Sequence, residues 1–171
     1  MRRISDGGIA ELKKMEGTEP YIYTCSAGAQ TIGVGHKLTR VEMDTGTIVI
    51  DGKEVRWIVG LTKEQIDSLL RKDLEWVELA INDSVRVPLT DNQFDALVAF
   101  TFNVGTSAFK GSTLLKKLNK GDYLSVPDEM RRWNKITVRQ VQDNGEWKSV
   151  KKVSPGLVRR RESEINLWLT P

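Results

Sequence analysis

Glu16 is the side chain in this sequence whose surroundings best suit proton transfer. Residues 5–16 carry apolar side chains at helical spacing and are followed by Gly17, so they predict a helix that ends at Glu16. The negative end of a helix dipole disfavours an ionised carboxylate, and partial burial adds to that effect. A glutamic acid that keeps its proton can protonate the leaving-group oxygen of a glycoside. From position alone, an ordinary exposed glutamate at a helix end is the commoner outcome.

The other reactive side chains are few, because the sequence has one cysteine, Cys25, and one histidine, His36. A lone cysteine excludes an internal disulfide and a cysteine-cluster metal site. A lone histidine argues against a histidine-based metal site and against a Ser-His-Asp triad. We therefore expect neither a metal nor a cofactor. Most cysteines that stand alone are small buried apolar groups, and that alternative stays open for Cys25.

Positive charge is concentrated near the C-terminus of the chain. The 171 residues carry a net charge of +3, but residues 131–161 contain ten basic and two acidic side chains. That segment is therefore +8 and the remainder −5. Such a basic region suits an anionic partner, although a solvated helix face explains a charge run equally well.

Membrane insertion and export are not indicated by the sequence. No stretch approaches the roughly 18 consecutive apolar residues that a membrane-spanning helix needs. Residues 1–17 hold two arginines but no apolar segment after them, so a cleavable signal peptide is not expected. We expect a protein without stable membrane insertion that stays in the cytoplasm of the producing cell until another factor releases it.

The elements that must position Glu16 follow from periodicity and turn signals. Ser5 or Asp6 can cap the first helix. Two short strands at 21–24 and 31–34, with a turn between them, follow it, and Asp51-Gly52 predicts a second hairpin at 46–57. Capping boxes at Thr62 and Thr90 begin two long helices, of which the second is apolar almost all round and should be central. We expect further helices at 112–119, 127–134 and 156–168, and a third hairpin at 136–150.

These elements predict an α+β fold with a small β-rich N-terminal lobe and a larger helical lobe. We expect one domain over residues 1–171. Its β-rich lobe covers about 17–60, and its helical lobe covers 1–16 and 61–171 with the 136–150 hairpin inserted. A cleft between two such lobes is where a ligand would lie.

The string from Glu16 to His36 resembles the phage lysozymes of glycoside hydrolase family 24. Glu16, eight residues, Cys25, five residues and Thr31 match the family pattern, and Thr31-Ile-Gly-Val-Gly-His36 resembles its TIGYGH-like strand with Val34 in place of Tyr. The resemblance continues through residues 89–105, 109–115, 118–122, 132–134 and 156–162, and so covers nearly the whole chain. It implies the lysozyme fold, in agreement with the two predicted lobes.

Carried over to this chain, the resemblance implies that Glu16 is the general acid and that Cys25 holds the position of the second catalytic residue. Thr31 would help to place the attacking water. A neutral thiol with its usual pKa of about 8.5 is a weak base at neutral pH. Cys25 could therefore act as a thiolate, accept a hydrogen bond from water, or attack as a nucleophile.

The resemblance also implies supporting residues. His36 would support the cleft, and one of the arginines at 159–161 would reach back to Glu16, with Arg159 and Arg160 the first choices. Phe102, Asn103 and Gly105 fall where the family lines its sugar groove. For Phe102, packing at a helix end is the alternative, and for each arginine it is a solvated helix face.

The implied function is that of an endolysin. It would hydrolyse the β-1,4 bond between N-acetylmuramic acid and N-acetylglucosamine in bacterial peptidoglycan, with inversion, as a monomer released by a holin. A lytic transglycosylase acting on the same bond is one alternative. A non-enzymatic module that binds cell wall or nucleic acid is another, but no nucleic-acid-binding motif supports the nucleic-acid version. The 136–150 hairpin is expected to border the cleft or extend the wall-contacting face.

Overall fold

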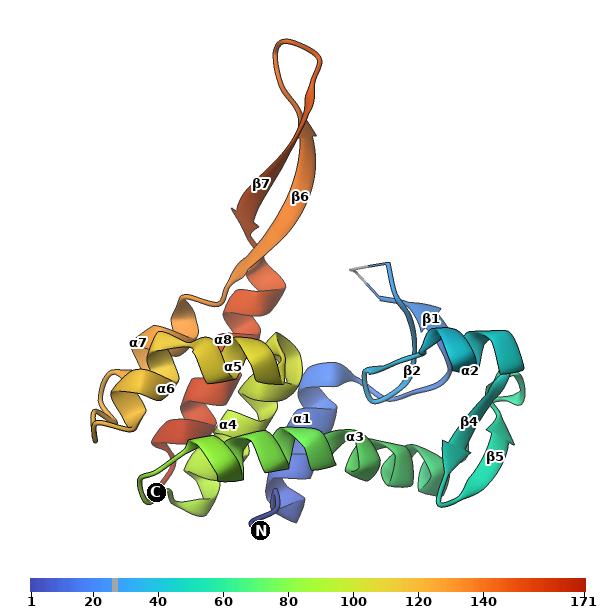
Figure 1. The fold of residues 1–171 in the computed structure, drawn as a ribbon, viewed down its shortest axis with the longest axis horizontal. Helices are drawn as coiled ribbons and strands as arrows, with labels where there is room; N and C mark the ends of the chain where they lie inside the picture. The colour runs from blue at the N-terminus through green and yellow to red at the C-terminus, as the bar shows by residue number, and fades with distance from the viewer. Residues whose placement is uncertain (26–27) are drawn as a thin grey trace.

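A computed structural model describes residues 1–25 and 28–171 and arranges them in two lobes with a projecting hairpin (Figure 1). The β lobe contains β1 (Glu19–Thr24), β2 (Gln30–Gly33), β3 (His36–Lys37), α2 (Arg40–Thr45), β4 (Thr47–Ile50), β5 (Lys53–Arg56) and the 3₁₀ turn η1 (Trp57–Val59). The helical lobe contains α1 (Asp6–Glu16), α3 (Lys63–Ser84), α4 (Asp91–Val104), α5 (Thr106–Gly111), α6 (Thr113–Leu118), α7 (Val126–Arg131) and α8 (Pro155–Leu169). The hairpin consists of β6 (Lys135–Val141) and β7 (Trp147–Val153). This is the α+β architecture of a small β-rich lobe and a larger helical lobe that the sequence predicts.

Two antiparallel sheets form the β lobe. β1, β2 and β3 pair in that order, and β4 pairs with β5. The Asp51-Gly52 turn joins β4 to β5 with both residues at positive φ, as expected for a two-residue hairpin turn. The turn predicted between β1 and β2 includes residues 26–27, which lie outside the described residues.

α3 connects the two lobes. It begins with the predicted capping box, in which the Thr62 hydroxyl accepts the Gln65 N–H and the Gln65 side chain accepts the Thr62 N–H. The helix packs against β2, β3 and β4 in the β lobe and against α4 and α5 in the helical lobe (Figure 1). One rigid element therefore fixes how the two lobes are placed.

The core of the helical lobe is built around α4. Its capping box at Thr90 is present, and every residue from Phe94 to Thr101 is buried. Both α8 and α1 pack against α4. The prediction of a central, buried helix is confirmed, because a helix that is apolar on all sides needs neighbours on all sides.

α1 is attached to α4 at its first turn. Ser5 caps α1 by accepting the Gly8 N–H, and its own N–H and hydroxyl donate to the buried Asp95 carboxylate at 3.0 and 2.5 Å. A Cβ at Gly8 would lie 2.5 Å from a carbon of that carboxylate, so only glycine allows this approach. This attachment at the N-terminal end of α1 fixes the direction of the helix, and with it the position of Glu16 at the C-terminal end.

The third hairpin is longer than the predicted range of 136–150. Its pairing runs without interruption from Lys135–Val153 to Val141–Trp147, and among the residues that the structure describes the two strands pair only with each other. Figure 1 shows it projecting away from both lobes. Two short helices were not predicted: α2, although Thr39 and Glu42 form a capping box at its start, and α5.

Within the described ranges, 1–25 and 28–171, no helix combines the length and the apolar character needed to cross a membrane.

Candidate active site

The Glu16 carboxyl lies at the last residue of α1, between the lobes, and is paired with an arginine. Gly17 ends the helix by donating its N–H to the Lys13 carbonyl with φ at +78°. The Glu16 side chain is 17% exposed, and its Oε1 lies 2.6 Å from Nη2 of Arg160. The acid is thus held within a recess rather than free on the surface.

Arg160 is held in place by two further acceptors. Its Nε donates to Oε1 of Glu164 at 3.0 Å, and its Nη2 donates to the Ala99 carbonyl of α4 at 3.3 Å. With only 10% of its side chain exposed, it has little freedom to leave Glu16. The arginine that reaches the acid is therefore Arg160, whereas Arg159 is exposed.

Behind Arg160 lies a buried ion cluster that the sequence analysis missed. Glu164 is fully buried and accepts a hydrogen bond from Arg161 Nη2 at 2.9 Å, and the same nitrogen donates to Oδ1 of Asn103 at 2.6 Å. The Arg161 guanidinium also lies over the Phe100 ring, 5.0 Å from its centroid. The cluster therefore links the acid, through Arg160 and Glu164, to Asn103 in the expected sugar groove.

Burial governs the protonation of this cluster. It raises the pKa of Glu164 to about 7, although Arg161 and Arg160 both act in the opposite direction. Burial likewise lowers the pKa of Arg161 despite its carboxylate partner. Both shifts indicate that the free-energy cost of removing these charges from water exceeds the free energy gained from their mutual attraction. Oε2 of Glu164 makes no hydrogen bond within the described part of the chain and is available to carry the proton.

The β1–β2 hairpin brings three of the relevant side chains to one face. Tyr23 is paired with Thr31, and the Cys25 N–H donates to the Ala29 carbonyl at 2.9 Å, so the antiparallel pairing continues past the end of β1. Residues two apart along a strand, and residues directly opposite, share a face. Tyr23, Cys25 and Thr31 therefore lie on the same side of the hairpin.

The causes of the raised pKa of Tyr23 indicate that this face of the hairpin lies near Glu16. Burial raises the pKa of Tyr23, and the negative charges of Glu16 and Cys25 add to the rise. Both groups thus lie within electrostatic reach of the Tyr23 hydroxyl. Sequence analysis did not single out Tyr23, although its position two residues before Cys25 places it on the same face. Thr31 is 2% exposed, and its hydroxyl donates to the Ala29 carbonyl at 3.1 Å.

The backbone at Gly35 forms the wall next to the acid. Gly35 has φ at +71°, and a Cβ there would lie 3.0 Å from Oε2 of Glu16 and 3.4 Å from the Phe102 ring. Phe102 is half-buried at the end of α4, and Asn103 and Gly105 are exposed beside it. The glycine therefore allows the β lobe, Glu16 and Phe102 to meet at one point.

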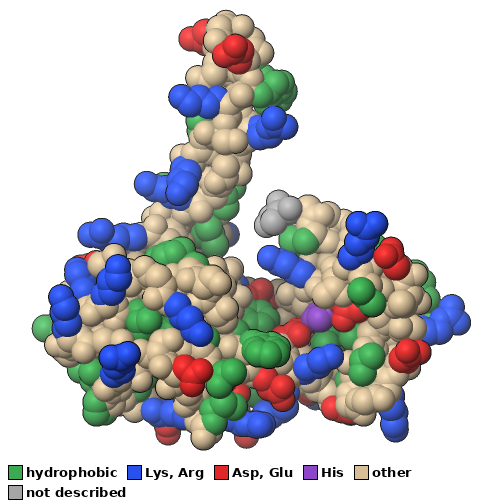
Figure 2. Space-filling model, viewed as in Figure 1, with side chains coloured by type: hydrophobic (Ala, Val, Ile, Leu, Met, Phe, Trp, Pro, Cys, Tyr) green, Lys and Arg blue, Asp and Glu red, His purple; other side chains and the backbone are tan. Residues whose placement is uncertain are grey.

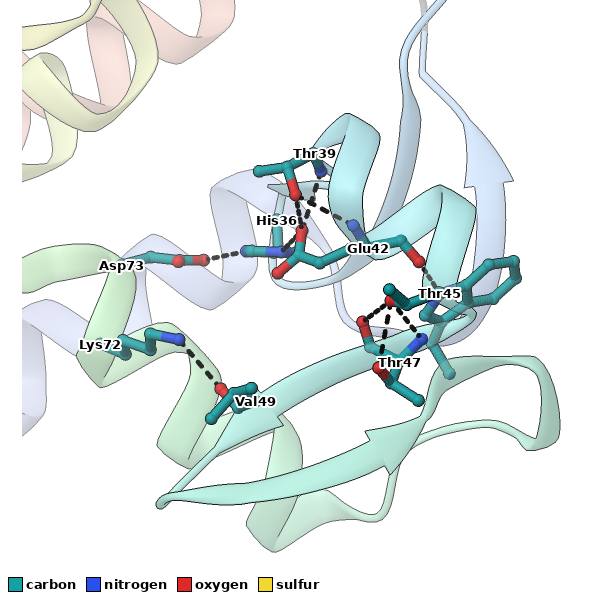
Figure 3. Close-up of polar contacts among 9 residues, drawn as sticks. His36, Thr39, Glu42, Thr45, Thr47, Val49, Lys72 and Asp73 are labelled. Carbon is teal, nitrogen blue, oxygen red and sulfur yellow. Dashed lines mark hydrogen bonds and ion pairs between the residues drawn. The ribbon is translucent and has the colours of Figure 1, made fainter.

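His36 is engaged elsewhere in the β lobe. Its Nδ1 lies 2.8 Å from Asp73 of α3 and its Nε2 lies 3.3 Å from Glu42 of α2 (Figure 3). Burial lowers the pKa of His36, but the hydrogen bonds and charges of the two carboxylates outweigh burial and raise it. Among the described residues, the expected support of Glu16 by His36 is therefore not found. His36 instead joins the β lobe to α3, and Arg160 contacts Glu16. Lys72 reinforces the same junction by donating to the Val49 carbonyl at 2.9 Å.

The surface is hollowed between the two lobes, below the hairpin (Figure 2). A pocket of about 540 Å³ lies on the helical side, lined by Asn103 and Val104 of α4 and by residues at the base of the hairpin. Across residues 1–25 and 28–171, no cluster of His, Cys, Asp and Glu side chains could hold a metal ion. The arrangement supplies an oriented carboxyl, a thiol and hydroxyls beside a cleft, which suits acid-assisted cleavage of a bound polymer.

Comparison with known proteins gives one family throughout. The family model described as phage lysozyme matches residues 13–164. The endolysin of Salmonella phage P22 is 44% identical over 135 residues, covering 79% of this chain and 86% of that protein. The solved endolysin of Escherichia coli O157:H7 phage FAHEc1 superposes with a TM-score of 0.77 at 36% identity, over 98% of this chain and 94% of the other. The muramidase domain of SpmX from Asticaccaulis excentricus superposes with a TM-score of 0.75 at 34% identity and full coverage of both chains.

Proposed function

Because the chain belongs to the phage lysozyme family, we propose that Glu16 is the general acid with which it cleaves the glycan strands of bacterial peptidoglycan. The protein is a lysozyme, a glycoside hydrolase of the endolysin type that acts in cell lysis. The observation that carries the assignment of the acid is the 2.6 Å contact between Glu16 and Arg160 in a recess against Gly35. This contact fixes one carboxyl oxygen and leaves the other to meet substrate.

The bond cleaved is the β-1,4 bond between N-acetylmuramic acid and N-acetylglucosamine. Phe102 offers an aromatic face to a sugar ring, and the exposed Asn103 amide offers a donor to an N-acetyl carbonyl. The amide oxygen of Asn103 is already occupied by Arg161, so its NH₂ group is oriented for the substrate. The exposed backbone at Gly105 completes this side of the groove.

In the reaction, Glu16 gives its proton to the leaving oxygen as the bond from that oxygen to the anomeric carbon breaks. A water held by the Thr31 hydroxyl and Cys25 adds to the anomeric carbon from the opposite face, and its proton passes to Cys25, which acts as a thiolate. Inversion of the anomeric centre follows from this placement of the water. Arg160 keeps the carboxyl aimed throughout, because its other contacts fix it to α4 and α8.

Two other functions considered from the sequence are not favoured. A lytic transglycosylase would form an anhydro sugar without water, and the relatives are endolysins and a muramidase. A purely binding function has no need of the paired acid. Mass spectrometry of the products separates the enzyme reactions, since anhydro ends would identify a transglycosylase.

The cellular setting is also part of the proposal. One catalytic domain acts as a monomer, without metal or cofactor, and a holin gives it access to the cell wall from the cytoplasm. Sedimentation of the purified protein tests the monomer, and lysis of cells that produce it with and without a holin tests the route.

The roles are tested by three variants assayed on purified peptidoglycan. Glu16→Gln should lower kcat by at least about a thousandfold, as expected for loss of a general acid in a site that keeps its binding groups. Cys25→Ser should retain more activity than Glu16→Gln, and Cys25→Asp should retain the most if the position acts on water. The anomer of the product is recorded by NMR. Full activity of Glu16→Gln, with an unchanged unfolding transition, would refute the assignment.

A further inference from the structure

Glu164 of α8 is completely buried and cannot touch a substrate, but both of its arginine partners reach the site. Its Oε1 accepts one hydrogen bond from Arg160 Nε at 3.0 Å and another from Arg161 Nη2 at 2.9 Å. Arg160 also lies 2.6 Å from the Glu16 carboxyl. Arg161 also donates to Oδ1 of Asn103 at 2.6 Å. One carboxyl oxygen is therefore shared by the arginine that contacts the acid and the arginine that contacts the expected sugar groove.

The two arginines need a common acceptor because they carry the same charge in a buried place. The exposed fraction of the side chain is 10% for Arg160 and 1% for Arg161. Burial lowers the pKa of Arg161 and the charge of Arg160 lowers it further, whereas Glu164 acts in the opposite direction. Like charges repel most strongly where water does not screen them. Without the shared oxygen, the two guanidinium groups would therefore move apart.

The direction of the Arg160 guanidinium depends on its bond to Glu164. Its contacts with Glu16 and with the Ala99 carbonyl both use Nη2. The bond to Glu164 uses a different nitrogen, Nε. A planar guanidinium that is held at two nitrogens has a fixed direction, whereas one held at a single nitrogen can rotate about it. Loss of the Glu164 oxygen would therefore free the group that holds the acid.

The Arg161 guanidinium depends on the same oxygen in a different way. Its carbon lies over the Phe100 ring, 5.0 Å from the ring centroid. Contact with the face of a ring leaves a guanidinium free to turn in its own plane. The bond from Nη2 to Glu164 opposes that turn, and the same Nη2 holds the amide oxygen of Asn103. The orientation of the Asn103 amide is therefore set by a nitrogen that Glu164 fixes.

We propose that Glu164 is a positioning residue for both halves of the site. Through Arg160 it directs the Glu16 carboxyl at the leaving oxygen. Through Arg161 it directs the Asn103 amide at the sugar. The proposal rests on the proposed function, which assigns the acid and the sugar groove.

Glu164 performs this role as a hydrogen-bond acceptor and does not need its negative charge. Both arginines use Oε1, and Oε2 makes no hydrogen bond among the residues that the structure describes. A glutamine at this position offers the same acceptor, with its NH₂ group in place of Oε2. Glutamine should therefore replace Glu164 in catalysis, whereas a side chain of similar size without an oxygen should not.

A matched pair of substitutions separates the acceptor from the buried bulk of the side chain. Glu164→Gln keeps the oxygen, and Glu164→Met removes it. Glu78→Met is the control, because Glu78 is also a buried carboxylate with a hydrogen bond, from the Ile4 N–H at 2.9 Å. Ile4 precedes α1, and Glu16 stands at the other end of that helix. For each variant, kcat and KM are measured on purified peptidoglycan, and urea unfolding gives the folded fraction.

Glu164→Met should lower kcat about tenfold, because the acid is no longer aimed, and raise KM about threefold, because the Asn103 amide loses its orientation. Glu164→Gln should stay within about twofold of the wild type in both constants, and so should Glu78→Met. Partial unfolding reduces the amount of active enzyme and so lowers the apparent kcat, but it leaves KM unchanged. A rise in KM is therefore a change that a merely structural role would not produce.

A cycle of variants assigns the two effects to the two arginines. Arg161→Met removes the connection to Asn103 and should raise KM more than it lowers kcat. Adding Glu164→Met should raise KM no further but should still lower kcat through Arg160. The double variant removes both members of a buried ion pair, which proteins tolerate better than loss of one member. It therefore provides the test of the kcat effect even if Glu164→Met alone does not fold.

Three outcomes overturn the proposal. Wild-type constants in folded Glu164→Met would make Glu164 a structural residue only. Equal losses in Glu164→Gln and Glu164→Met would mean that the charge, and not the acceptor, is needed. An equal rise of KM in Glu78→Met would assign the effect to loss of a buried carboxylate anywhere in the fold.

Failure of the proposed function gives a different result, in which the wild type does not cleave peptidoglycan at all. Binding of soluble muropeptides is therefore also measured in a Glu16→Gln background, where no cleavage is needed. There Glu164→Met should weaken binding about threefold, and Glu164→Gln should leave it unchanged. Equal affinity of these two variants would overturn the proposal by itself.

Discussion

Replacing Glu164 with glutamine removes a charge from the buried cluster behind Arg160 while keeping the shape of the side chain. Burial raises the pKa of Glu164 from an ordinary 4.5 to about 7. Each unit of such a shift corresponds to about 1.4 kcal/mol, so keeping this group ionised in the folded protein costs about 3 kcal/mol. Glutamine resembles the protonated acid and carries no such cost.

The sign follows from proton binding in the two states. Between pH 4.5 and 7 the folded protein keeps a proton on Glu164 that the unfolded chain has released. The free energy of unfolding of the wild type therefore falls as the pH rises through this window. We expect Glu164→Gln to match the wild type at about pH 5 and to exceed its free energy of unfolding by up to about 3 kcal/mol at about pH 8.

Urea unfolding of both proteins at the two pH values measures this difference. The pKa of His36 is also raised, by its hydrogen bonds and charges with Asp73 and Glu42, but His36 is present in both proteins and its contribution cancels. Glu162→Gln, two residues away in an exposed ion pair with Arg131, is the control and should change the free energy by less than about 1 kcal/mol at either pH. If Glu164→Gln is the less stable protein at the higher pH, pairing with Arg160 and Arg161 outweighs burial and the reasoning is wrong.

Two further substitutions test the junctions around the acid. Loss of His36, in His36→Gln, should cost about 1–3 kcal/mol at acidic pH and less at alkaline pH, because a group with a raised pKa stabilises the fold below its unfolded pKa and loses that effect as the pH rises through its folded pKa. Urea midpoints give the comparison, and equal losses at both pH values would contradict it. Gly35→Ala should cost about 1–2 kcal/mol through its positive φ and lower kcat about tenfold by displacing Glu16. Gly46→Ala has the same φ with nothing within 4 Å and should lose stability alone, so equal activity losses in the two variants would exclude displacement of the acid.

Much of the fold could be predicted because its signals are local. The capping boxes at Thr62 and Thr90 and the Asp51-Gly52 turn each specify one backbone conformation within a few residues. α5 was missed because its cap, Gly105, makes no side-chain hydrogen bond. α2 has a complete signal at Thr39, but its six residues include none that is buried, so no apolar periodicity marks it.

The candidate site was predictable only where spacing along the chain carries the information. The spacing of Glu16, Cys25 and Thr31 predicts the first side of the cleft. The spacing of Arg160, Arg161 and Glu164 on one helix was visible in the sequence, but not the burial that makes Glu164 unusual, because burial depends on how α8 meets α4. For the same reason the choice among three adjacent arginines, and the partners of His36, had to come from the structure.

The contact between Glu16 and Arg160 can form only after α8 has been synthesised, long after α1. Glu16 lies on α1 and the guanidinium that holds it lies on α8, which follows α1 by more than a hundred residues. A growing chain can form α1 and the β lobe while it is still attached to the ribosome, but the acid has no cation to orient it until α8 has emerged and packed on α4. Synthesis and packing of α8 therefore work as an activation step, and fragments that end before α8 would carry Glu16 without the guanidinium that orients it.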